Sequence, residues 1–591
     1  MAFETIPQRV FANARRLGSA PAYFVRGGSG WEATSWEGYA AGVRRAGAAL
    51  VSLGVEAGQA VCILGANRPE WVTFDVGAMA AGTIPAGIYT TSSPAECAYI
   101  LDHSEAPVIL VENEAQWQKI ASVRDQLPRL RHVVMMRGGG AVDDPMVIPW
   151  DTFLGRSDDA GPGALDERMA ALRPDTVSTL IYTSGTTGRP KGVMLTQDNL
   201  AWTAAQACDL VGAGEKERVL SYLPLSHIAE QMFTIHIAAV AGYPVYYAES
   251  LDKLLANMVE VEPTMFFGVP RVWEKFHAGV LEKLSENDGV KSKLVGQATA
   301  VGRRVISRVS QGQRAAIPDA AQFTVFEKLV YSKVKEGLGL SSARMCVSGA
   351  APISQEVLEF FAGFGLPIYE VYGQSEDSGP TSFNFPGRTR FGTVGPPFPG
   401  VEIKIASDGE LIVRGRNVFA GYFKDPEATA EAVSDGWLHT GDLGEFDADG
   451  YLSITGRKKD IIITAGGKNV APKLLEGGIR SHPLVSEAVV IGDRRKFLSA
   501  LVSLDSEAAG RFMKERELSG PPEHCDEIRA EIQQAVDTVN AEMARVEQIK
   551  KFTILPRELS IAEGELTPTL KVKRNVVASH FEPEIEAMYS D

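Results

Sequence analysis

The residue types best suited to chemistry gather in one short segment, which reads LIYTSGTTGRPKGVMLT from Leu180 to Thr196. Backbone N–H groups, hydroxyls and one cation are what a loop needs to surround phosphate oxygens. It is not a Walker A loop, because no Gly-Lys-Ser/Thr ends it and Gly192 leads into another strand rather than a helix. A flexible Ser/Thr/Gly connector is the alternative for a loop of this composition taken alone. The residues that we expect to contact phosphate are Thr183, Ser184, Gly185, Thr186, Thr187, Gly188 and Lys191.

Other kinds of catalytic site leave no signature in the sequence. The five cysteines lie far apart with no CxxC pair, which argues against a zinc ribbon and a disulfide framework and fits a reducing compartment. No His-Cys-Asp cluster has metal-ligand spacing, and neither a GxSxG elbow nor an HExxH motif occurs. The sequence therefore disfavours a hydrolase and a zinc enzyme.

The phosphate-loop segment lies within alternating strand-like and helix-like runs from about Ala60 to Tyr372. AVCILG precedes the amphipathic NRPEWVTFDVGAMAAG, and ARMCVSG precedes SQEVLEFFAGF and then PIYEVYG. Such alternation predicts parallel sheets covered by helices. From Phe391, short runs broken by Gly and Pro predict a β-rich subdomain of antiparallel strands. Beyond it, strand-like runs and a helical pattern from Asp526 to Gln548 predict a small α+β unit of about 130 residues.

Length, composition and charge bound the class of protein. The chain has 591 residues, of which 45% are hydrophobic and 23% charged, and this predicts a folded protein with several core-bearing units. Its 59 basic and 74 acidic residues give a net charge of −15, which disfavours a nonspecific hold on nucleic acid. Glu4 and Pro7 stand where a secretory signal needs a basic end and an apolar run, and no run approaches the roughly 20 apolar residues of a spanning helix. We therefore expect a cytoplasmic protein.

The motifs together resemble the adenylate-forming enzymes, which include acyl-CoA synthetases, adenylation domains of peptide synthetases and luciferases. YTSGTTGRPKGV is similar to the phosphate-loop signature of that superfamily. Further motifs follow in the expected order: SYLPLSHIAE, FFGVPRVWEKF, VSGAAPIS, YEVYGQSE, GWLHTGDLGEFDADGYLSITGRKKDIIITAGGKNVAP and ELTPTLKVKR. GIYTTSSPAECAYI, the Ser-His-Ile-Ala-Glu run and an insertion from about Asn287 to Leu340 look most like bubblegum-type long-chain fatty acyl-CoA synthetases.

The resemblance implies a reaction of ATP, a fatty acid and CoA, with Mg²⁺ as the metal. A carboxylate attacks the α-phosphate of ATP and a thiol then displaces AMP, so charge must be stabilised at phosphorus first and at a carbonyl second. By resemblance, Glu376 holds Mg²⁺, an ion suited to one carboxylate plus phosphate oxygens, and Ser375 directs its hydroxyl toward the α-phosphate. Taken singly, Glu376 would be an ordinary loop carboxylate and Tyr372 a core aromatic. The residues expected around the adenine are Gly349, Ala350, Ala351 and Tyr372, and Gly373 is a further residue expected to bind the nucleotide.

Asp442 and Arg457 resemble the pair that holds the ribose hydroxyls. A carboxylate accepts from a diol and an arginine fork fixes it, so the residue types suit the task. Lys459 follows at the spacing of the superfamily's hinge, where a small domain of residues 459–591 is expected to rotate against a large domain of residues 1–458. A turn aspartate and a solvated basic cluster are the alternatives.

Two further parts of the site are expected by resemblance. Gly466 and Gly467 would let the backbone approach the pantetheine arm of CoA, and a tight turn is the alternative. His227, in an apolar run that also contains His236, is expected to line the acyl-carboxylate end, while the following helix walls the acyl-chain tunnel. In an arbitrary helix both would be satisfied core or surface histidines.

A lysine near the C-terminus reaches the α-phosphate and the attacking carboxylate in this superfamily, and Lys571 in TPTLKVKR is our candidate. The run lacks the commoner glycine before the lysine, so Lys573 remains the alternative. We favour Lys571 because alternation along an extended run puts both lysines on one face, while Pro568 fixes the approach closer to Lys571.

Rival functions stay open. A fatty acyl-AMP ligase would pass its adenylate to a carrier-protein thiol, although the sequence contains no fused carrier domain. A catalytically silent lipid- or nucleotide-binding protein would keep the fold alone. No stable protein partner is implied. Between Lys291 and Arg314, basic residues stand among Val, Leu and Ile at helical spacing, which fits peripheral contact with an anionic membrane and equally a solvated helix.

Overall fold

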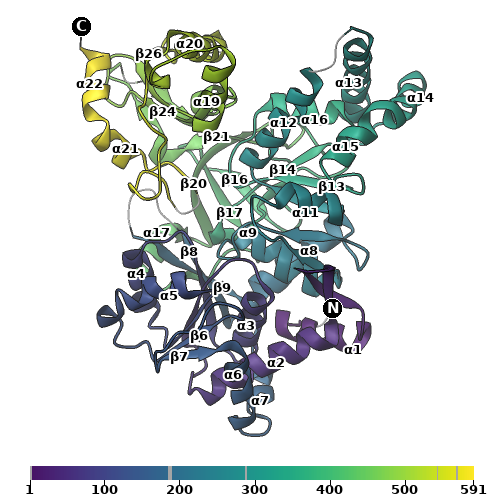
Figure 1. Ribbon diagram of the computed structural model, residues 1–591, viewed down its shortest axis with the longest axis vertical. Coiled ribbons are helices and arrows are strands. Elements are labelled where there is room, and N and C mark those ends of the chain that lie inside the picture. The colour runs from purple at the N-terminus through teal and green to yellow at the C-terminus, as the bar shows by residue number, and fades with distance from the viewer. Residues whose placement is uncertain are drawn as a thin grey trace.

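Two eight-stranded sheets covered by helices form the large N-terminal body (Figure 1). The computed structural model describes residues 3–183, 189–285, 289–466, 468–541, 543–567 and 570–590. Both sheets are mainly parallel, with antiparallel strands added at edges, so the prediction of parallel sheets covered by helices is confirmed.

The first sheet carries the strand that leads into the phosphate-loop segment. Its strand order is β18-β9-β8-β4-β3-β5-β6-β7, in which β8 runs parallel to β4 while β9 turns back antiparallel to β8. Strands β3, β4 and β5 are buried along their whole length, as expected of central parallel strands. The bounds are β3 Ala60–Leu64, β4 Ile84–Ile88, β5 Val108–Val111, β6 His132–Met135, β7 Val147–Pro149, β8 Val177–Thr183, β9 Lys191–Thr196 and β18 Gly421–Tyr422.

The second sheet has the order β15-β14-β13-β12-β10-β11-β1-β2. Its central strands β12, β13 and β14 run parallel, so their carboxyl ends meet at one edge. The bounds are β1 Pro21–Gly27, β2 Gly30–Ser35, β10 Val219–Ser221, β11 Val245–Tyr247, β12 Met265–Gly268, β13 Met345–Ser348, β14 Ile368–Tyr372 and β15 Ser382–Phe383. Helices that cover the two sheets include α2 Trp36–Ser52, α4 Pro94–Ser104, α5 Glu114–Ala121, α8 Gln197–Val211, α11 Leu254–Val261 and α16 Gln355–Gly363.

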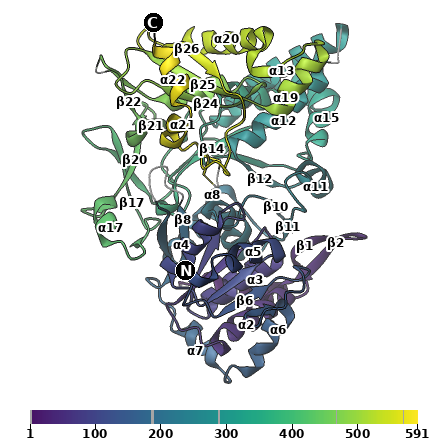
Figure 2. The ribbon, with the colours of Figure 1, turned by 60° about the vertical axis from the view of Figure 1, so that its left-hand side comes forward.

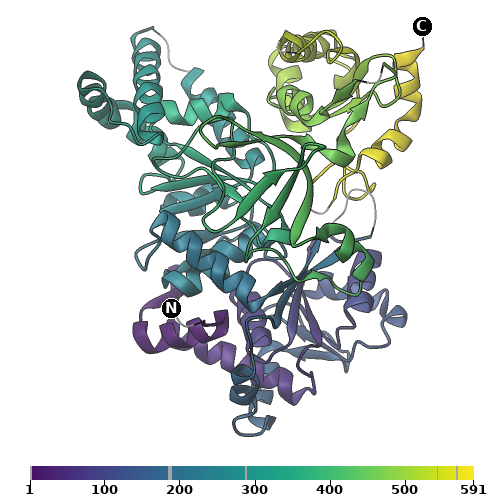
Figure 3. The same ribbon diagram turned by 180° about the vertical axis from the view of Figure 1, so that it is seen from behind.

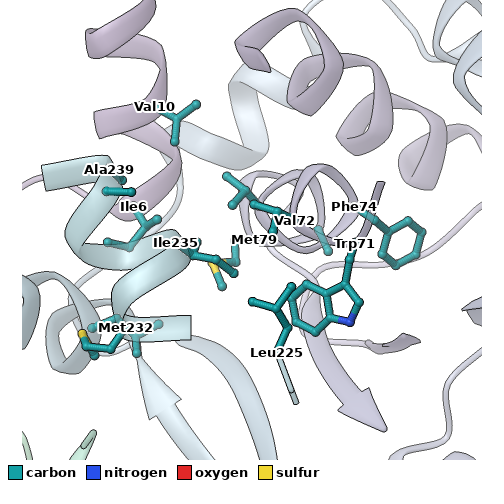
Figure 4. Packing of buried hydrophobic residues seen from close by; sticks show 14 of the residues in the cluster. Ile6, Val10, Trp71, Val72, Phe74, Met79, Leu225, Met232, Ile235 and Ala239 are labelled. Carbon is teal, nitrogen blue, oxygen red and sulfur yellow. The ribbon is translucent and has the colours of Figure 1, made fainter. Parts of the chain in front are cut away.

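Helix α3 (Pro69–Ala80) differs from the amphipathic helix that the sequence predicts. Its residues are buried on every side, from Glu70 to Ala80. Figure 4 shows the cause, since Trp71 and other side chains of α3 interlock with those of α1 (Ile6–Leu17) and of the helical segment 228–241 in one core. A helix inside such a core has no solvated face, so its periodicity carries no amphipathic signal.

A β-rich subdomain follows, as the sequence predicts. Its sheet is antiparallel and is built around β20, the longest of its strands. The bounds are β16 Glu402–Ile405, β17 Glu410–Arg414, β19 Val433–Ser434, β20 Trp437–Phe446 and β21 Leu452–Arg457. The short helix α17 (Pro426–Ala432) packs beside β18 and connects this subdomain to the first sheet.

The C-terminal part is a small α+β domain with a core of its own, which confirms that prediction (Figures 1 and 3). The predicted helix from Asp526 ends early, at Ala541, because the side chain of Asn540 bonds the backbone N–H and C=O of Ile549 and the chain turns back into a strand. The bounds are β22 Ile462–Ile463, β23 Asn469–Val470, α18 Pro472–Arg480, β24 Val485–Ile491, β25 Leu498–Leu504, α19 Ser506–Glu515, α20 Asp526–Ala541, β26 Ile549–Ile554, α21 Arg574–His580 and α22 Glu582–Tyr589.

A helical insertion projects from the end of the body at which the small domain lies, on the side away from that domain (Figures 1 and 2). Helix α13 buries Ala298, Val301 and Val305 against the body, whereas α14 has no buried residue. In the part of the chain that the structure describes, no helix is both long enough and apolar enough to cross a membrane. The insertion follows α12 (Pro270–Ser285) of the body, and its helices are α13 Gly289–Ser310, α14 Ile317–Phe326 and α15 Ser332–Gly337.

Candidate active site

The phosphate-loop segment stands at the carboxyl end of a parallel strand, where ligands bind in open α/β sheets. Thr183 ends β8 and is the cross-strand partner of Lys191, which begins β9. Gly192 continues into the strand, as the sequence predicts. The five residues between, whose phosphate contacts stay a prediction, lie outside the described residues: Ser184, Gly185, Thr186, Thr187 and Gly188.

Lys191 and Glu376 share one aromatic neighbour, Tyr422, which sequence reasoning missed. The Lys191 ammonium lies 4.7 Å from the centroid of the Tyr422 ring. The Tyr422 hydroxyl donates a hydrogen bond of 2.9 Å to Glu376 Oε1. The residue meets Lys191 only because β18 pairs with β9, a contact between distant segments that no local pattern in FAGYFKDP reveals.

Tyr372, Asp442 and Arg457 form a second group. The Tyr372 hydroxyl donates to Asp442 Oδ2 at 2.8 Å, and Arg457 Nε lies 3.2 Å from Asp442 Oδ1. Asp442 and Arg457 are direct cross-strand partners of β20 and β21, so the structure brings together the two residues expected at the ribose. Burial and the charge of Asp442 hold the pKa of Tyr372 well above its usual value, so the phenol remains a donor.

The segment Gly349–Ala351 follows β13 beside the end of β14, where Tyr372 stands. A Cβ on Gly349 would lie 2.6 Å from Val371 Cγ1, so only glycine allows this approach. Ala350 adopts a φ of 69°, in the left-handed region that costs an L-residue roughly 1–2 kcal/mol. Backbone strain of this kind concentrates at functional sites.

Gly373 and Ser375 lie on the same edge. A Cβ on Gly373 would be 1.5 Å from the Gly379 carbonyl oxygen, which leaves no space for a side chain. Ser375 is buried and begins a 3-10 turn, η5 (Ser375–Asp377), with Glu376 at its centre. The turn therefore fixes the backbone from which the Glu376 carboxylate projects.

His227 begins a helix rather than lying inside one, which corrects the sequence prediction. It is the N-cap of α9 (Ile228–Gln231), and its Nδ1 accepts a hydrogen bond of 3.1 Å from the Ala229 N–H. The neutral ring therefore carries its proton on Nε2. Burial, and secondarily the charge of Lys571, lower the pKa of His227 to about 4, so the ring is neutral at pH 7.

The helix continues as a π-helical turn, η3 (Met232–His236), and then as α10 (Ile237–Ala241). His236 is fully buried with neither ring nitrogen bonded to another described residue, and burial lowers its pKa to about 3. It is therefore a neutral core histidine, but not the satisfied one of the alternative interpretation.

Glu230 anchors this segment and was also missed from sequence. It is buried, and its Oε1 accepts from the hydroxyls of Ser221 at 2.6 Å and Thr234 at 2.7 Å. Asn67 Nδ2 lies 3.4 Å from the same oxygen. Burial raises the pKa of Glu230 to about 7. The sequence pattern could have identified Glu230, because it is a charged residue within an apolar run and lies close to His227.

Lys571 extends from the small domain into this site. It is accessible to water, yet the protein encloses it closely enough that desolvation, followed by the charges of Arg457 and Lys473, lowers its pKa. The carboxylates of Asp442 and Glu376 act in the opposite direction. Charged groups of both domains thus act on the ammonium group of Lys571.

The segment that contains Lys571 and Lys573 is not the extended run that our argument for Lys571 assumes, so the choice of Lys571 over Lys573 stays a prediction. The segment is a turn rather than an extended run, because Leu566 bridges Val572 and Leu570 adopts a φ of 61°. Pro568 and Thr569 lie outside the described residues. Lys573 caps α21, and its N–H donates to the Glu565 carbonyl at 2.7 Å.

A 3-10 turn, η6 (Lys458–Asp460), stands where we expect the connection between the body and the small domain. Lys459 is exposed there, whereas Lys458 forms an ion pair with Asp408 at 2.6 Å. Gly466 lies in an exposed turn of the small domain, and the predicted role of Gly467 falls outside the described residues.

The single carboxylate of Glu376 suits a Mg²⁺ ion whose other ligands are phosphate oxygens of the substrate and water. The described residues contain no group of three or more His, Cys, Asp or Glu side chains arranged to hold a metal. Mg²⁺ is bound in many phosphate-using sites by one or two carboxylates, substrate phosphates and water. Glu376, in the turn η5 that packs against β9, is such a carboxylate, and the hydrogen bond that it accepts from Tyr422 leaves further lone pairs free to coordinate.

Comparison with known proteins identifies the class. The chain matches the model of the AMP-binding enzyme family over residues 10–423 and that of the AMP-binding enzyme C-terminal domain over residues 459–591. It therefore belongs to the AMP-binding enzyme family. It is 38% identical to a Xenopus laevis protein named long-chain-fatty-acid–CoA ligase ACSBG2, over 99% of this chain and 84% of the relative.

Further similarities agree with that class. The chain is 41% identical to the Mycobacterium bovis long-chain-fatty-acid–CoA ligase FadD15, over 93% of this chain and 91% of the relative. The fold matches the crystal structure of the anthranilate CoA ligase AuaEII in complex with anthranoyl-AMP, with a TM-score of 0.74, 21% identity and coverage of 99% of each chain. The fold class of a large body and a smaller C-terminal domain is thereby confirmed.

Proposed function

We propose that this protein is an AMP-forming long-chain fatty acid–CoA ligase, which converts a fatty acid, ATP and CoA to acyl-CoA, AMP and pyrophosphate through an acyl-adenylate. The observation that carries the proposal is the approach of Lys571 to groups of the body. Its charge acts on His227, and the carboxylates of Asp442 and Glu376 act on it. The names of the relatives support a long-chain fatty acid as the acyl substrate.

In the first half-reaction a carboxylate oxygen of the fatty acid forms a bond to the α-phosphorus, and the bond to the pyrophosphate leaving group breaks. Lys571 places positive charge beside the oxygens on which negative charge builds up. Asp442 accepts from the ribose hydroxyls, and Arg457 and Tyr372 hold its carboxylate in position. Bound at Glu376, Mg²⁺ would neutralise phosphate charge. Lys191 contacts the phosphates as a point charge.

In the second half-reaction the CoA thiolate sulfur forms a bond to the acyl carbon and AMP leaves. Neutral His227 can donate from Nε2 to the acyl oxygen without adding a charge to the buried site. Lys571 has to leave for the thiol to approach, so we propose that residues 459–591 rotate as a domain against residues 1–458, with Lys459 at the hinge. Gly466 and Gly467 then let the backbone approach the pantetheine arm.

The test is product analysis. With a panel of fatty acids of different lengths, we expect pyrophosphate and AMP in equal amounts and consumption of free CoA. ADP as the product would overturn the mechanism. Pyrophosphate release without use of free CoA would favour the fatty acyl-AMP ligase, and no fatty-acid-dependent release would favour the silent homologue. Glu376→Ala should reduce Mg²⁺-dependent adenylation by about 100-fold or more, and normal activity would remove Glu376 from the site.

We further propose that the protein is cytoplasmic and that its helical insertion contacts anionic membrane surfaces. Residues 289–335 carry nine Lys and Arg against two acidic residues, a net charge of +7 in a chain of net charge −15. Apolar side chains are exposed beside them, with Ile317 at 86%, Val325 at 54% and Leu329 at 50%. Basic residues around an exposed apolar stripe suit a bilayer that contains anionic lipids, from which a fatty acid could be taken up.

A further inference from the structure

Tyr422 contacts two groups of opposite charge, the Lys191 ammonium and the Glu376 carboxylate. Its ring faces the Lys191 ammonium at 4.7 Å from the centroid, and its hydroxyl bonds Glu376 Oε1 at 2.9 Å. One side chain therefore contacts both a cation, through the face of its ring, and an anion, through its O–H. Each contact is favourable, and neither neutralises the charge that it holds.

The backbone around Tyr422 is fixed on both sides. Within the edge strand, Phe423 N–H donates to Gly192 O at 2.8 Å and Ala420 N–H to Met194 O at 2.9 Å. Tyr422 N–H donates to Thr429 Oγ1 at 2.8 Å. The strand that begins with Lys191 therefore sets the position of Tyr422 along the sheet edge.

The same segment also holds the turn that carries Glu376. Phe419 N–H donates to the Glu376 carbonyl at 2.9 Å, and the Phe419 ring packs edge-on against that of Tyr422 with centroids 4.9 Å apart. Residues 419–422 thus bond both the backbone and the side chain of Glu376. A rigid connection runs from the start of β9 to the Glu376 carboxylate.

We propose that Tyr422 is a positioning residue that keeps Lys191 and Glu376 apart and correctly aimed before the nucleotide binds. Without it, the ammonium and the carboxylate would be free to form a direct ion pair, which would occupy the groups needed for phosphate and for the metal. The inference rests on the proposed nucleotide site, and it concerns a residue that the sequence motifs did not single out.

Two substitutions separate the two contacts. Tyr422→Phe keeps the ring for Lys191 and removes only the hydroxyl bond to Glu376. Tyr422→Leu retains apolar volume but holds neither charge. Tyr422 lines an open pocket of about 520 Å³ with Met194, Phe419 and Thr429, and both substitutions reduce the side-chain volume, so neither can overpack its surroundings. Tyr451 offers a matched control, because its ring lies 4.6 Å from the Arg390 guanidinium in the β-rich subdomain, and we would make the same two changes there.

The measurement is binding of Mn²⁺ and ATP without fatty acid, followed by electron paramagnetic resonance of free Mn²⁺ and by calorimetry of ATP. We expect Tyr422→Phe to weaken Mn²⁺ binding several-fold while ATP affinity in the absence of metal stays within about two-fold. Tyr422→Leu should weaken both by about ten-fold or more. The Tyr451 variants should bind as the wild type does, and thermal unfolding verifies that each variant is folded.

The outcomes distinguish this inference from the proposed function. A wild-type protein that binds no Mn²⁺ and no ATP overturns both. If the wild type binds and folded Tyr422→Leu binds equally well, only the role of Tyr422 is overturned. If Tyr422→Phe and Tyr422→Leu lose Mn²⁺ and ATP affinity equally, the ring and the hydroxyl do not have separate roles.

Discussion

Arg271 of α12 and Glu487 of β24 face each other across the boundary between the body and the small domain, with Arg271 Nη1 3.8 Å from Glu487 Oε1. Arg480 of the small domain lies 3.7 Å from the same carboxylate and 3.8 Å from Glu274 of α12. Two arginines and two glutamates thus alternate across the interface. Burial raises the pKa of Glu487, and the two arginines oppose this shift. These contacts occur in the pose that holds Lys571 in the site.

We expect this charge cluster to favour the adenylation pose. Single ion pairs of this kind contribute about 1 kcal/mol or less, and a network contributes more. Arg271→Glu places like charges opposite each other, so the adenylation half-reaction should slow by about three- to ten-fold while thioester formation from supplied acyl-adenylate and CoA does not slow. Separate assays of the two half-reactions measure this difference.

A charge swap supplies the decisive control. Arg271→Glu combined with Glu487→Arg should recover part of the lost adenylation rate, because opposite charges face each other again across the boundary, although Arg480 then faces a like charge at position 487. Arg495→Glu breaks a pair with Glu586 that lies within the small domain and should leave the ratio of the two half-reactions unchanged. Equal slowing of both half-reactions by Arg271→Glu would contradict a role in selecting the pose.

The sequence predicts the fold well where local patterns decide it. Short apolar runs with glycine or proline at their ends become the buried strands β3, β4 and β5, and the antiparallel texture after Phe391 becomes the β-rich subdomain. Helix α3 is the exception, since burial from every direction removes the polar face on which an amphipathic prediction depends.

The site is predictable only in part, for two physical reasons. Asp442 and Arg457 stand on adjacent strands of one hairpin, so their meeting follows from local structure. Tyr422 reaches Lys191 through pairing of strands far apart in the chain, which one sequence does not encode locally. At Lys571, a left-handed Leu570 turns the chain where alternation assumes an extended strand.

We expect Lys571→Ala to separate the two half-reactions completely. The ammonium stabilises charge only while the carboxylate attacks phosphorus, so acyl-adenylate formation should fall by about 100-fold or more. Conversion of supplied acyl-adenylate and CoA to thioester should continue near the wild-type rate. Lys573→Ala is the matched control and should adenylate normally. If Lys573→Ala loses adenylation and Lys571→Ala does not, the assignment of the lysine is wrong.

Because the carboxyl group of Glu370 is buried, we expect it to make the free energy of unfolding depend on pH. It is 8% exposed, its Oε2 accepts from Gly392 N–H at 3.2 Å, and burial raises its pKa to about 8. An unfolded glutamate has a pKa of about 4.3. Between these values the unfolded state binds fewer protons than the folded state, so the contribution of this group to stability is full at low pH and is lost as pH rises toward 8.

Glu370→Gln removes that titration while keeping the shape of the side chain. Relative to the wild type, the variant should gain stability as pH rises from about 5 to about 8 and gain no more above it, by a few kcal/mol at most. Thermal unfolding of both proteins at pH 5, 7 and 9 measures the difference. Glu402→Gln, at an exposed carboxylate of β16 paired with Arg414, is the control. A difference that does not change with pH would contradict the raised pKa.

We expect the helical insertion to bind membranes that contain anionic lipids. In a flotation assay at low salt, we expect the protein to rise with vesicles that contain anionic lipid and to stay behind with neutral ones, because the +7 charge of residues 289–335 attracts the lipid headgroups. Higher salt should weaken binding by screening.

Ile317→Asp with Val325→Asp places two charges in the exposed stripe of α14 and should reduce flotation by about ten-fold, since burial of those side chains in the bilayer adds to the attraction. Leu251→Asp, at an apolar residue that is 67% exposed outside the insertion, should change nothing. Absence of binding to anionic vesicles at low salt, or equal loss in the Leu251 variant, would contradict this use of the surface, and an acidic protein partner would then be the occupant to test.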